Sequence, residues 1–297
     1  MILAAGLTPA WQQILTFDRL IIGQVNRAQS TLWCGSGKVL NVGAALHHLG
    51  AMSLTLSPIG GAVGNLIRDD FAARGIPARW VTTSASTRVC TTLLDRSVGQ
   101  LDESATSTTT ELVENSSPLS ELELHQYVAA FAEEARAATC VVYCGSLPRQ
   151  TPSNFYRRLM EHSAASAIMD VRGSELIQCL PLRPLLVKPN REELAATVGR
   201  SLETDADVVE AMSELRQLGA EWVVVSSGPD PLLVLGPSGL TRISPPSVRV
   251  VNPIGCGDSL TAAIAMKITA GCEPLDAIRF GVEYAAKKAG SIFPVLS

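Results

Sequence analysis

The chain has 297 residues with a formal net charge of −4, and 46% of its residues are hydrophobic. This length can bury a large α/β core, and the composition is that of an ordinary globular protein. The mild acidity excludes an extended basic surface for nucleic acid, and no run of 18 apolar residues predicts a membrane span. The N-terminus lacks the basic segment of a signal peptide, so we expect a cytoplasmic protein.

The seven cysteines lie far apart, at positions 34, 90, 140, 144, 179, 256 and 272. None forms a Cys-x-x-Cys pair, and the four histidines do not cluster with them. We therefore expect reduced, buried thiols rather than disulfides or a metal–thiolate site.

Apolar strand-like runs alternate with helical patterns, most clearly in the second half of the chain. The predicted strands are residues 2–7, 54–59, 140–144, 167–171, 185–188, 221–226, 232–235 and 240–243. The predicted helices are residues 39–49, 64–74, 119–138, 152–162, 206–218, 257–269 and 274–289. Runs such as Trp222-Val223-Val224-Val225 are apolar on both faces, which is typical of parallel strands covered by helices on both sides.

Two regions, residues 13–32 and 81–112, break this alternation and predict strands and turns without helices. The second contains a turn at 97–100 and a threonine-rich stretch at 106–110, which suits pleated strands. We expect a small β-sheet outside the main sheet, placed as a lid and built from about 10–34 and 82–115. A flexible low-complexity loop at 104–110 is the alternative. No repeat or linker divides the chain, so residues 1–297 are predicted to form one domain.

The segment 249–259 carries the most informative motif. An apolar strand ends at a turn in which Gly255 and Gly257 flank Cys256, Asp258 follows, and a long helix begins. The free backbone N–H groups and the dipole at a helix N-terminus attract an anion. Asp258 places a carboxylate beside that anion, where a general base for phosphoryl transfer to a hydroxyl is needed.

Other polar or glycine-rich loops follow predicted strands at 143–148, 188–194 and 225–231, and a Gly-Lys pair opens the helix after residue 36. Gly37 and Lys38 do not have the spacing of a P-loop, and a structural turn explains them equally well. Asn190 and Glu193 have the spacing of a capping box, or alternatively organise Mg²⁺ through its water shell. Ligands of open α/β sheets bind at the carboxyl ends of strands, so we expect these loops to lie together.

The order of these motifs resembles the PfkB carbohydrate kinases, and within them the branch of 1-phosphofructokinase and tagatose-6-phosphate kinase. The resemblance runs over nearly the whole chain and implies a ribokinase-like α/β/α sandwich with ATP and Mg²⁺ as cofactors. The matching segments are Thr8-Pro9-Ala10, Ser36-Gly37-Lys38-Val39-Leu40-Asn41-Val42, Gly145-Ser146-Leu147-Pro148 with Phe155-Tyr156, Lys188-Pro189-Asn190 with Glu193, and the segment from Asn252 to Asp258.

The resemblance also implies a role for each matched residue. Asp258 would accept the proton of the acceptor hydroxyl, and Arg88, at the start of a lid strand, would bind a phosphate already on the sugar; a solvated strand arginine is the alternative. The remaining implied sites are the anion hole (Gly255, Cys256, Gly257), the sugar site (Gln12, Gly37, Lys38, Asn41), the nucleotide site (Lys188, Asn190, Ser226, Gly228) and the Mg²⁺ site (Asn190, Glu193, through water).

The sequence departs from the family pattern mainly where a sugar would be chosen. Gln12 stands where the family has an aspartate that grips sugar hydroxyls, and a glutamine carries no charge there. Ser36 and Val39 replace glycines of the sugar loop, and Pro231 replaces a glycine of the nucleotide loop. The residues implied in phosphoryl transfer follow the pattern.

We therefore expect an ATP-dependent kinase acting on a sugar phosphate, at the C6 hydroxyl of fructose 1-phosphate or the C1 hydroxyl of tagatose 6-phosphate. The alternatives are a kinase for an unphosphorylated sugar or nucleoside, and a non-catalytic sugar- or nucleotide-binding regulator on the same scaffold. A dinucleotide oxidoreductase is disfavoured, because no Gly-x-Gly-x-x-Gly follows the first strand. A small sheet with two exposed faces tends to find a partner, so we expect a homodimer formed through the lid.

Overall fold

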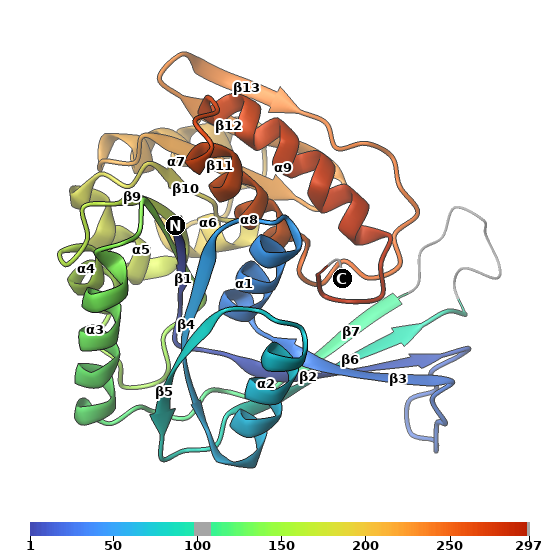
Figure 1. Ribbon diagram of the computed structural model, residues 1–297. Coiled ribbons are helices and arrows are strands. Elements are labelled where there is room, and N and C mark those ends of the chain that lie inside the picture. Colours follow the sequence, from blue (N-terminus) through green and yellow to red (C-terminus); the bar gives the residue numbers. More distant parts are fainter. Residues whose placement is uncertain (98–107, 296–297) are drawn as a thin grey trace.

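A nine-stranded sheet forms the centre of the molecule in the computed structural model, which describes residues 1–97 and 108–295 (Figure 1). Its strands lie in the order β13 (Gly239–Ile243), β12 (Asp230–Gly236), β11 (Trp222–Ser227), β10 (Leu186–Val187), β9 (Ser166–Asp170), β8 (Cys140–Cys144), β1 (Ile2–Ala5), β4 (Ser53–Gly60) and β5 (Ala78–Thr83). Neighbours from β11 to β5 are parallel, and β12 runs antiparallel to both of its neighbours, β11 and β13. The predicted mostly parallel sheet is confirmed.

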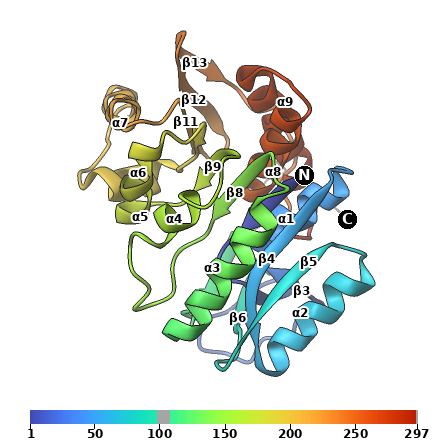
Figure 2. The same cartoon turned by 60° about the vertical axis from the view of Figure 1, so that its left-hand side comes forward.

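Helices cover both faces of this sheet, as Figure 2 shows. Successive side chains of a strand point to opposite faces. On β1, Leu3 and Ala5 accordingly join one core cluster, whereas Ile2 and Ala4 join the other. The first cluster is covered by α3 (Glu121–Ala135), α4 (Phe155–Met160), α5 (Gly173–Cys179), α6 (Arg191–Val198) and α7 (Asp205–Gln217), and the second by α1 (Lys38–His48), α2 (Gly61–Ala73), α8 (Cys256–Thr269) and α9 (Pro274–Ala289).

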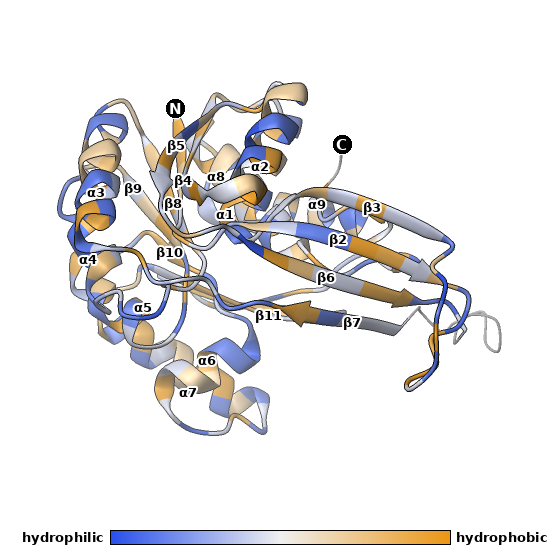
Figure 3. Cartoon of the chain, turned by 90° about the horizontal axis from the view of Figure 1, so that it is seen from below, coloured by the Kyte–Doolittle hydropathy of each residue, from blue (hydrophilic) through white to orange (hydrophobic). Residues whose placement is uncertain are grey.

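A separate four-stranded sheet, here called the lid sheet, projects from the helical body (Figure 3). Its strands lie in the order β3 (Ser30–Ser36), β2 (Ala10–Phe17), β6 (Arg88–Asp95) and β7 (Thr108–Val113). The predicted second sheet is confirmed, although Thr82 and Thr83 belong to β5 of the main sheet. The predicted turn at 97–100 and the first part of the stretch at 104–110 lie outside the described residues, apart from Ser97.

The sequence patterns were least accurate for short helices. Helix α5 has seven residues and was not predicted, because so short a segment shows no apolar periodicity; a one-turn 3₁₀ helix (Leu180–Leu182) follows it. Helix α4 begins at Phe155, three residues after the predicted start. In the described part of the chain, no helix combines the length and the apolar character needed to cross a membrane.

Candidate active site

The turn before α8 is fixed by one buried amide. The Asn252 side chain accepts a hydrogen bond from the Ile254 N–H (3.0 Å) and donates one to the Ile292 carbonyl (2.8 Å). The next residue, Gly255, has a φ of 82°, and a Cβ there would lie 2.0 Å from the Pro294 carbonyl oxygen. Only glycine fits, because the backbone is left-handed and the C-terminal segment packs directly against it.

Helix α8 begins without a side-chain cap. The Cys256 N–H donates to the Pro253 carbonyl at 3.2 Å, while the N–H groups of Gly255 and Gly257 have no partner among the described residues. Such unpartnered donors at a helix N-terminus form a binding place for an anion. The three residues expected to form an anion hole are thus contiguous in one turn, with the N–H of Cys256 held in the turn itself.

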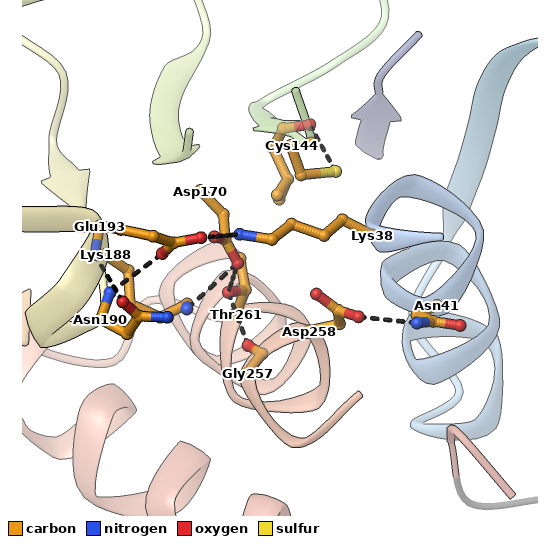
Figure 4. A network of polar contacts seen from close by, with 12 residues as sticks. Lys38, Asn41, Cys144, Asp170, Lys188, Asn190, Glu193, Gly257, Asp258 and Thr261 are labelled. Atoms are coloured by element: carbon orange, nitrogen blue, oxygen red, sulfur yellow. Dashed lines mark hydrogen bonds and ion pairs between the residues drawn. The ribbon is translucent and has the colours of Figure 1, made fainter. Parts of the chain in front are cut away.

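Asp258 lies in the first turn of α8, buried at 7% exposure. Its Oδ2 accepts a hydrogen bond of 2.7 Å from the Asn41 side chain of α1 (Figure 4). Burial, and secondarily the negative charge of Asp170, raises the pKa of Asp258 from 3.8 to about 6. A carboxylate with a pKa near neutrality, held beside free N–H groups, has the properties of a general base.

The sugar-loop residues meet this carboxylate through α1. Gly37 precedes the helix with a φ of 87°, and a Cβ there would lie 2.7 Å from the Thr8 carbonyl oxygen. Asn41, one turn further on, is oriented by Ser36, whose hydroxyl donates to its Oδ1 at 3.1 Å. The replacement of a family glycine by Ser36 therefore gives Asn41 a partner. The predicted proximity of the Gly37 loop to Asp258 is observed.

A network of buried charges lies on the other side of Asp258 (Figure 4). Its centre is Asp170, at the end of β9, whose two oxygens pair with Lys38 (2.7 Å) and Lys188 (3.1 Å). Thr261 of α8 also donates to Asp170, at 2.9 Å. Burial opposes the ionised form of Asp170, but the two ammonium groups outweigh it and lower the pKa from 3.8 to about 2.

Asp170 was not singled out from the sequence. The signal that could have identified it is a carboxylate at the end of a strand that is otherwise apolar on both faces. Such a residue is unfavourable in a core unless it is paired. The pairing partners, however, come from three distant segments, and no local pattern predicts them.

Lys38, the first residue of α1, joins that helix to the charged network around Asp170. Its ammonium pairs with Glu193 at 2.9 Å as well as with Asp170, and these charges outweigh burial and raise its pKa. Its expected contact with the sugar stays a prediction. In the structure its ammonium points toward Asp170 and Glu193 (Figure 4).

Asn190 and Glu193 form a complete capping box at the start of α6. The Asn190 side chain accepts from the Glu193 N–H at 2.7 Å, and Glu193 Oε2 accepts from the Asn190 N–H at 3.0 Å. Asn190 also forms a parallel β-bridge with Ser226, which brings the 188–194 and 225–231 loops together as expected. Gly228, in the same loop, has a left-handed φ of 58° and open space around its Cα.

Asn190 and Glu193 fit Mg²⁺ only as contacts to its water shell. No group of three His, Cys, Asp or Glu side chains that could enclose a metal is present among residues 1–97 and 108–295. Glu193 retains lone pairs on both oxygens, and Mg²⁺ keeps several waters and uses substrate phosphates as ligands. The donor set therefore fits an ion held mainly by nucleotide phosphates and water, with Glu193 and Asn190 contacting its water shell.

The two lid residues expected to bind the sugar lie on neighbouring strands. Gln12 of β2 is buried and donates to the Thr92 hydroxyl of β6 at 2.7 Å. Arg88 of β6 donates to the carbonyls of Thr8 (3.2 Å), Pro9 (3.3 Å) and Glu114 (2.9 Å). These bonds use three of the five N–H groups of its guanidinium. Whether Arg88 also meets a phosphate stays a prediction.

The site as a whole combines unpartnered N–H groups at a helix N-terminus, an adjacent buried carboxylate and several ammonium groups at the carboxyl edge of a parallel sheet. This is the equipment of a phosphotransferase acting on a hydroxyl. The model of the pfkB family of carbohydrate kinases matches residues 14–292, and the chain belongs to this family. It is therefore an ATP-dependent sugar kinase, as the resemblance implied.

Individual relatives agree with this assignment. The chain is 30% identical to a 1-phosphofructokinase of Haloferax volcanii over 98% of its own length and 91% of the relative. It superposes with a TM-score of 0.87 on phosphofructokinase-2 from Escherichia coli, solved in complex with potassium, at 26% identity over 99% of this chain and 94% of the other. A possible 1-phosphofructokinase from Thermotoga maritima shares the fold, with a TM-score of 0.86 at 20% identity over 100% and 94% of the two chains.

Proposed function

We propose that this kinase transfers the γ-phosphoryl group of ATP to a hydroxyl of a sugar phosphate, with Asp258 as the general base. The observation that carries the proposal is the position of Asp258: a buried carboxylate with a pKa of about 6, one residue after the free N–H of Gly257. The acceptor oxygen must reach the γ-phosphorus while its proton leaves, so base and anion hole must adjoin.

In the proposed reaction the acceptor hydroxyl gives its proton to Asp258 as its oxygen bonds to the γ-phosphorus. The bond between that phosphorus and the bridging oxygen of ATP breaks, and ADP leaves. The N–H groups of Gly255 and Gly257 bind the oxygens of the transferring group. The Lys188 ammonium lies next to the same turn, 3.5 Å from where a Cβ on Gly257 would be. Glu193 and Asn190 would contact the water shell of a Mg²⁺ ion bound with ATP, and the ion would neutralise phosphate charge.

Fructose 1-phosphate is the acceptor that we favour, with tagatose 6-phosphate as the next candidate. The support is the 30% identity to a 1-phosphofructokinase, together with Arg88 at the base of the lid sheet. Two N–H groups of Arg88 remain for a phosphate after its three backbone bonds. The nucleotide side would be formed by Lys188, Asn190, Ser226 and Gly228.

An unphosphorylated sugar or a nucleoside is the second candidate. The observation in its favour is that the carbonyls of Thr8, Pro9 and Glu114 already engage the Arg88 guanidinium, as in a purely structural arginine. Membership of a kinase family argues against a non-catalytic regulator, because the charged groups of the site are all present.

We also propose a homodimer formed through the lid sheet. The register places Gln13, Trp33, Thr91 and Leu112 on one face of this sheet, and Trp33 and Leu112 are 45% and 56% exposed. An exposed apolar sheet face of this kind is typical of an interface. Light scattering of the wild type and of Trp33→Glu tests this proposal; a monomeric wild type would refute it.

The base assignment is tested by Asp258→Asn. The kcat for the preferred acceptor should fall by about 10²–10⁴-fold, the usual contribution of a general base. The raised pKa means that ionising Asp258 destabilises the native state as the pH rises from 3.8 through 6. The variant should therefore melt at a higher temperature than the wild type at pH 7, which excludes misfolding as the cause. Near-normal turnover in the variant would refute the assignment.

A further inference from the structure

A buried lysine lies behind the proposed anion hole. Lys288, in the last turn of α9, is completely buried. Its ammonium donates to the Asn252 carbonyl at 2.7 Å and to the Ile254 carbonyl. Helices α8 and α9 lie side by side in Figures 1 and 2, so the side chain reaches the turn that precedes α8. None of the roles assigned above uses this residue.

The bond to Ile254 acts directly on the anion hole. The Ile254 carbonyl and the Gly255 N–H belong to one planar trans peptide, so they point in opposite directions. The Gly255 N–H has no partner within the described part of the chain. An ammonium that holds the carbonyl from behind therefore aims this N–H toward the site. It also polarises the peptide and makes the N–H a stronger donor.

The charge of Lys288 is costly for folding alone. No carboxylate forms an ion pair with it among the described residues, and its ammonium has only carbonyl partners. Burial accordingly lowers the pKa of Lys288 from 10.5 to about 8, although the electrostatic interactions with Cys256 and Asp258 act in the opposite direction. An apolar side chain would fill the same space without this penalty. A positive charge there is favourable once an anionic phosphoryl group occupies the N-terminus of α8.

We propose that Lys288 is the positioning residue of the anion hole: its ammonium fixes the Ile254–Gly255 peptide and serves as a built-in monovalent cation behind the transferring phosphoryl group. The inference rests on the proposed anion hole at residues 255–257. It applies whichever sugar is the acceptor, because Lys288 acts on the phosphoryl side alone.

The test compares Lys288→Met with Lys287→Ala, which removes the exposed lysine next to it on α9. Lys288→Met should lower kcat about 10- to 100-fold with KM for the sugar nearly unchanged, less than the roughly 10²–10³-fold loss for a deleted oxyanion-hole donor. Lys287→Ala should behave as the wild type. Lys288→Gln, which keeps N–H donors for the two carbonyls, provides a second neutral variant if the methionine disturbs folding. Equal kcat values in the wild type and the neutral variants would overturn the proposal.

A rescue experiment separates positioning from packing. In Lys288→Ala the ammonium is replaced by a small cavity facing two carbonyl oxygens. Potassium or ammonium chloride should raise its kcat several-fold, whereas tetramethylammonium chloride, too large to enter, should not. The wild type should respond equally to all three salts. Loss of kcat without rescue, or a wild type that itself requires potassium or ammonium, would overturn the proposal.

ATP hydrolysis without sugar is measured for the same variants, because it depends on the anion hole and not on the acceptor. A wild type that hydrolyses ATP but phosphorylates no sugar phosphate contradicts the proposed substrate class. The ATP-hydrolysis rates of the Lys288 variants relative to the wild type would still test the present inference. A wild type that phosphorylates its sugar equally well with and without the Lys288 ammonium contradicts only the present inference.

Discussion

The phosphoryl-transfer end and the lid sheet of this kinase are built by different means. At the proposed phosphoryl-transfer end, which comprises residues 252–258 with Asp170 and Lys188, the groups are held by a constrained turn, a buried ion pair and a hydrogen bond to Asp258. The lid sheet instead carries exposed apolar side chains, and its two candidate sugar residues, Gln12 and Arg88, bond to neighbouring strands and loops. The difference indicates that the groups proposed for phosphoryl transfer are held in place by the fold, whereas the proposed choice of sugar rests on a sheet whose candidate residues depart from the family pattern.

The largest expected effect is that of removing the charge at the centre of the network. Asp170→Asn leaves the almost fully buried Lys188 without a carboxylate, because its one ion pair among the described residues is with Asp170. Breaking a buried pair from one side costs about 3–5 kcal/mol, so urea denaturation should show a loss of this size in the free energy of unfolding.

Acid should reproduce this loss in the wild type. The pKa of Asp170 is lowered from 3.8 to about 2, so its stabilising contribution is complete above pH 4 and is lost as the pH falls toward 2. If Asp170→Asn were as stable as the wild type at pH 7, and its free energy of unfolding had the same dependence on acidic pH, the network would not stabilise the fold.

The second effect concerns the backbone of the proposed anion hole. Gly255→Ala introduces a Cβ at 2.0 Å from the Pro294 oxygen in a left-handed residue and should lower kcat about 10²–10³-fold. The matched control is Gly271→Ala, at the other end of α8, with a φ of 85° and nothing within 4 Å of the added Cβ. The control should lose only about 1–2 kcal/mol of stability and keep its kcat. Similar kinetics in both variants would remove the special role of the turn.

The third effect is a shift in pH dependence. If Asp258 is the base, kcat should rise about tenfold per pH unit below pH 6 and level off above it, because this carboxylate must be ionised to accept a proton. The hydrogen bond from Asn41 lowers the pKa of Asp258, so Asn41→Ala should move the acidic limb to higher pH. Ionisation of the sugar phosphate affects both proteins equally and cancels in this comparison. An unmoved limb would assign the titration to another group.

The smallest effect is expected in the lid sheet. Thr92→Val removes the hydroxyl that accepts the Gln12 amide and should raise KM for the sugar about 2- to 10-fold, equivalent to one hydrogen bond, with kcat unchanged. Thr91→Ser, which keeps a hydroxyl on the opposite face of β6, is the control and should leave KM unaltered. If both variants alter KM alike, Gln12 does not orient the sugar.

The features predicted correctly from the sequence are those encoded locally. The turn at Gly255, the helix after it and the two apolar faces of the strands follow from a few adjacent residues. The apolar strand expected just before that turn does not form, and residues 244–250 have no regular secondary structure. The capping box of Asn190 and Glu193 was also recognisable from its spacing. The second sheet was predicted because threonine-rich runs interrupt the alternation of strands and helices.

The features that were missed depend on long-range packing. Asp170 acquires its role from Lys38 and Lys188, which come from α1 and from the loop after β10. Lys287 and Lys288 are neighbours in the sequence, yet one is exposed and the other is buried against the turn before α8. Lys288 follows Gly281 and Tyr284 at helical spacing on the buried face of α9, but its contact with the turn before α8 depends on the packing of the two helices.

The proposal of a sugar-phosphate kinase is tested most directly by paired acceptors. The kcat/KM of the wild type with ATP is measured for fructose 1-phosphate and fructose, and for tagatose 6-phosphate and tagatose, with fructose 6-phosphate included. We predict that fructose 1-phosphate exceeds fructose by about 10²-fold or more, since a guanidinium–phosphate contact is a strong, charge-assisted anchor. Equal or higher values for the unphosphorylated sugars would contradict the account.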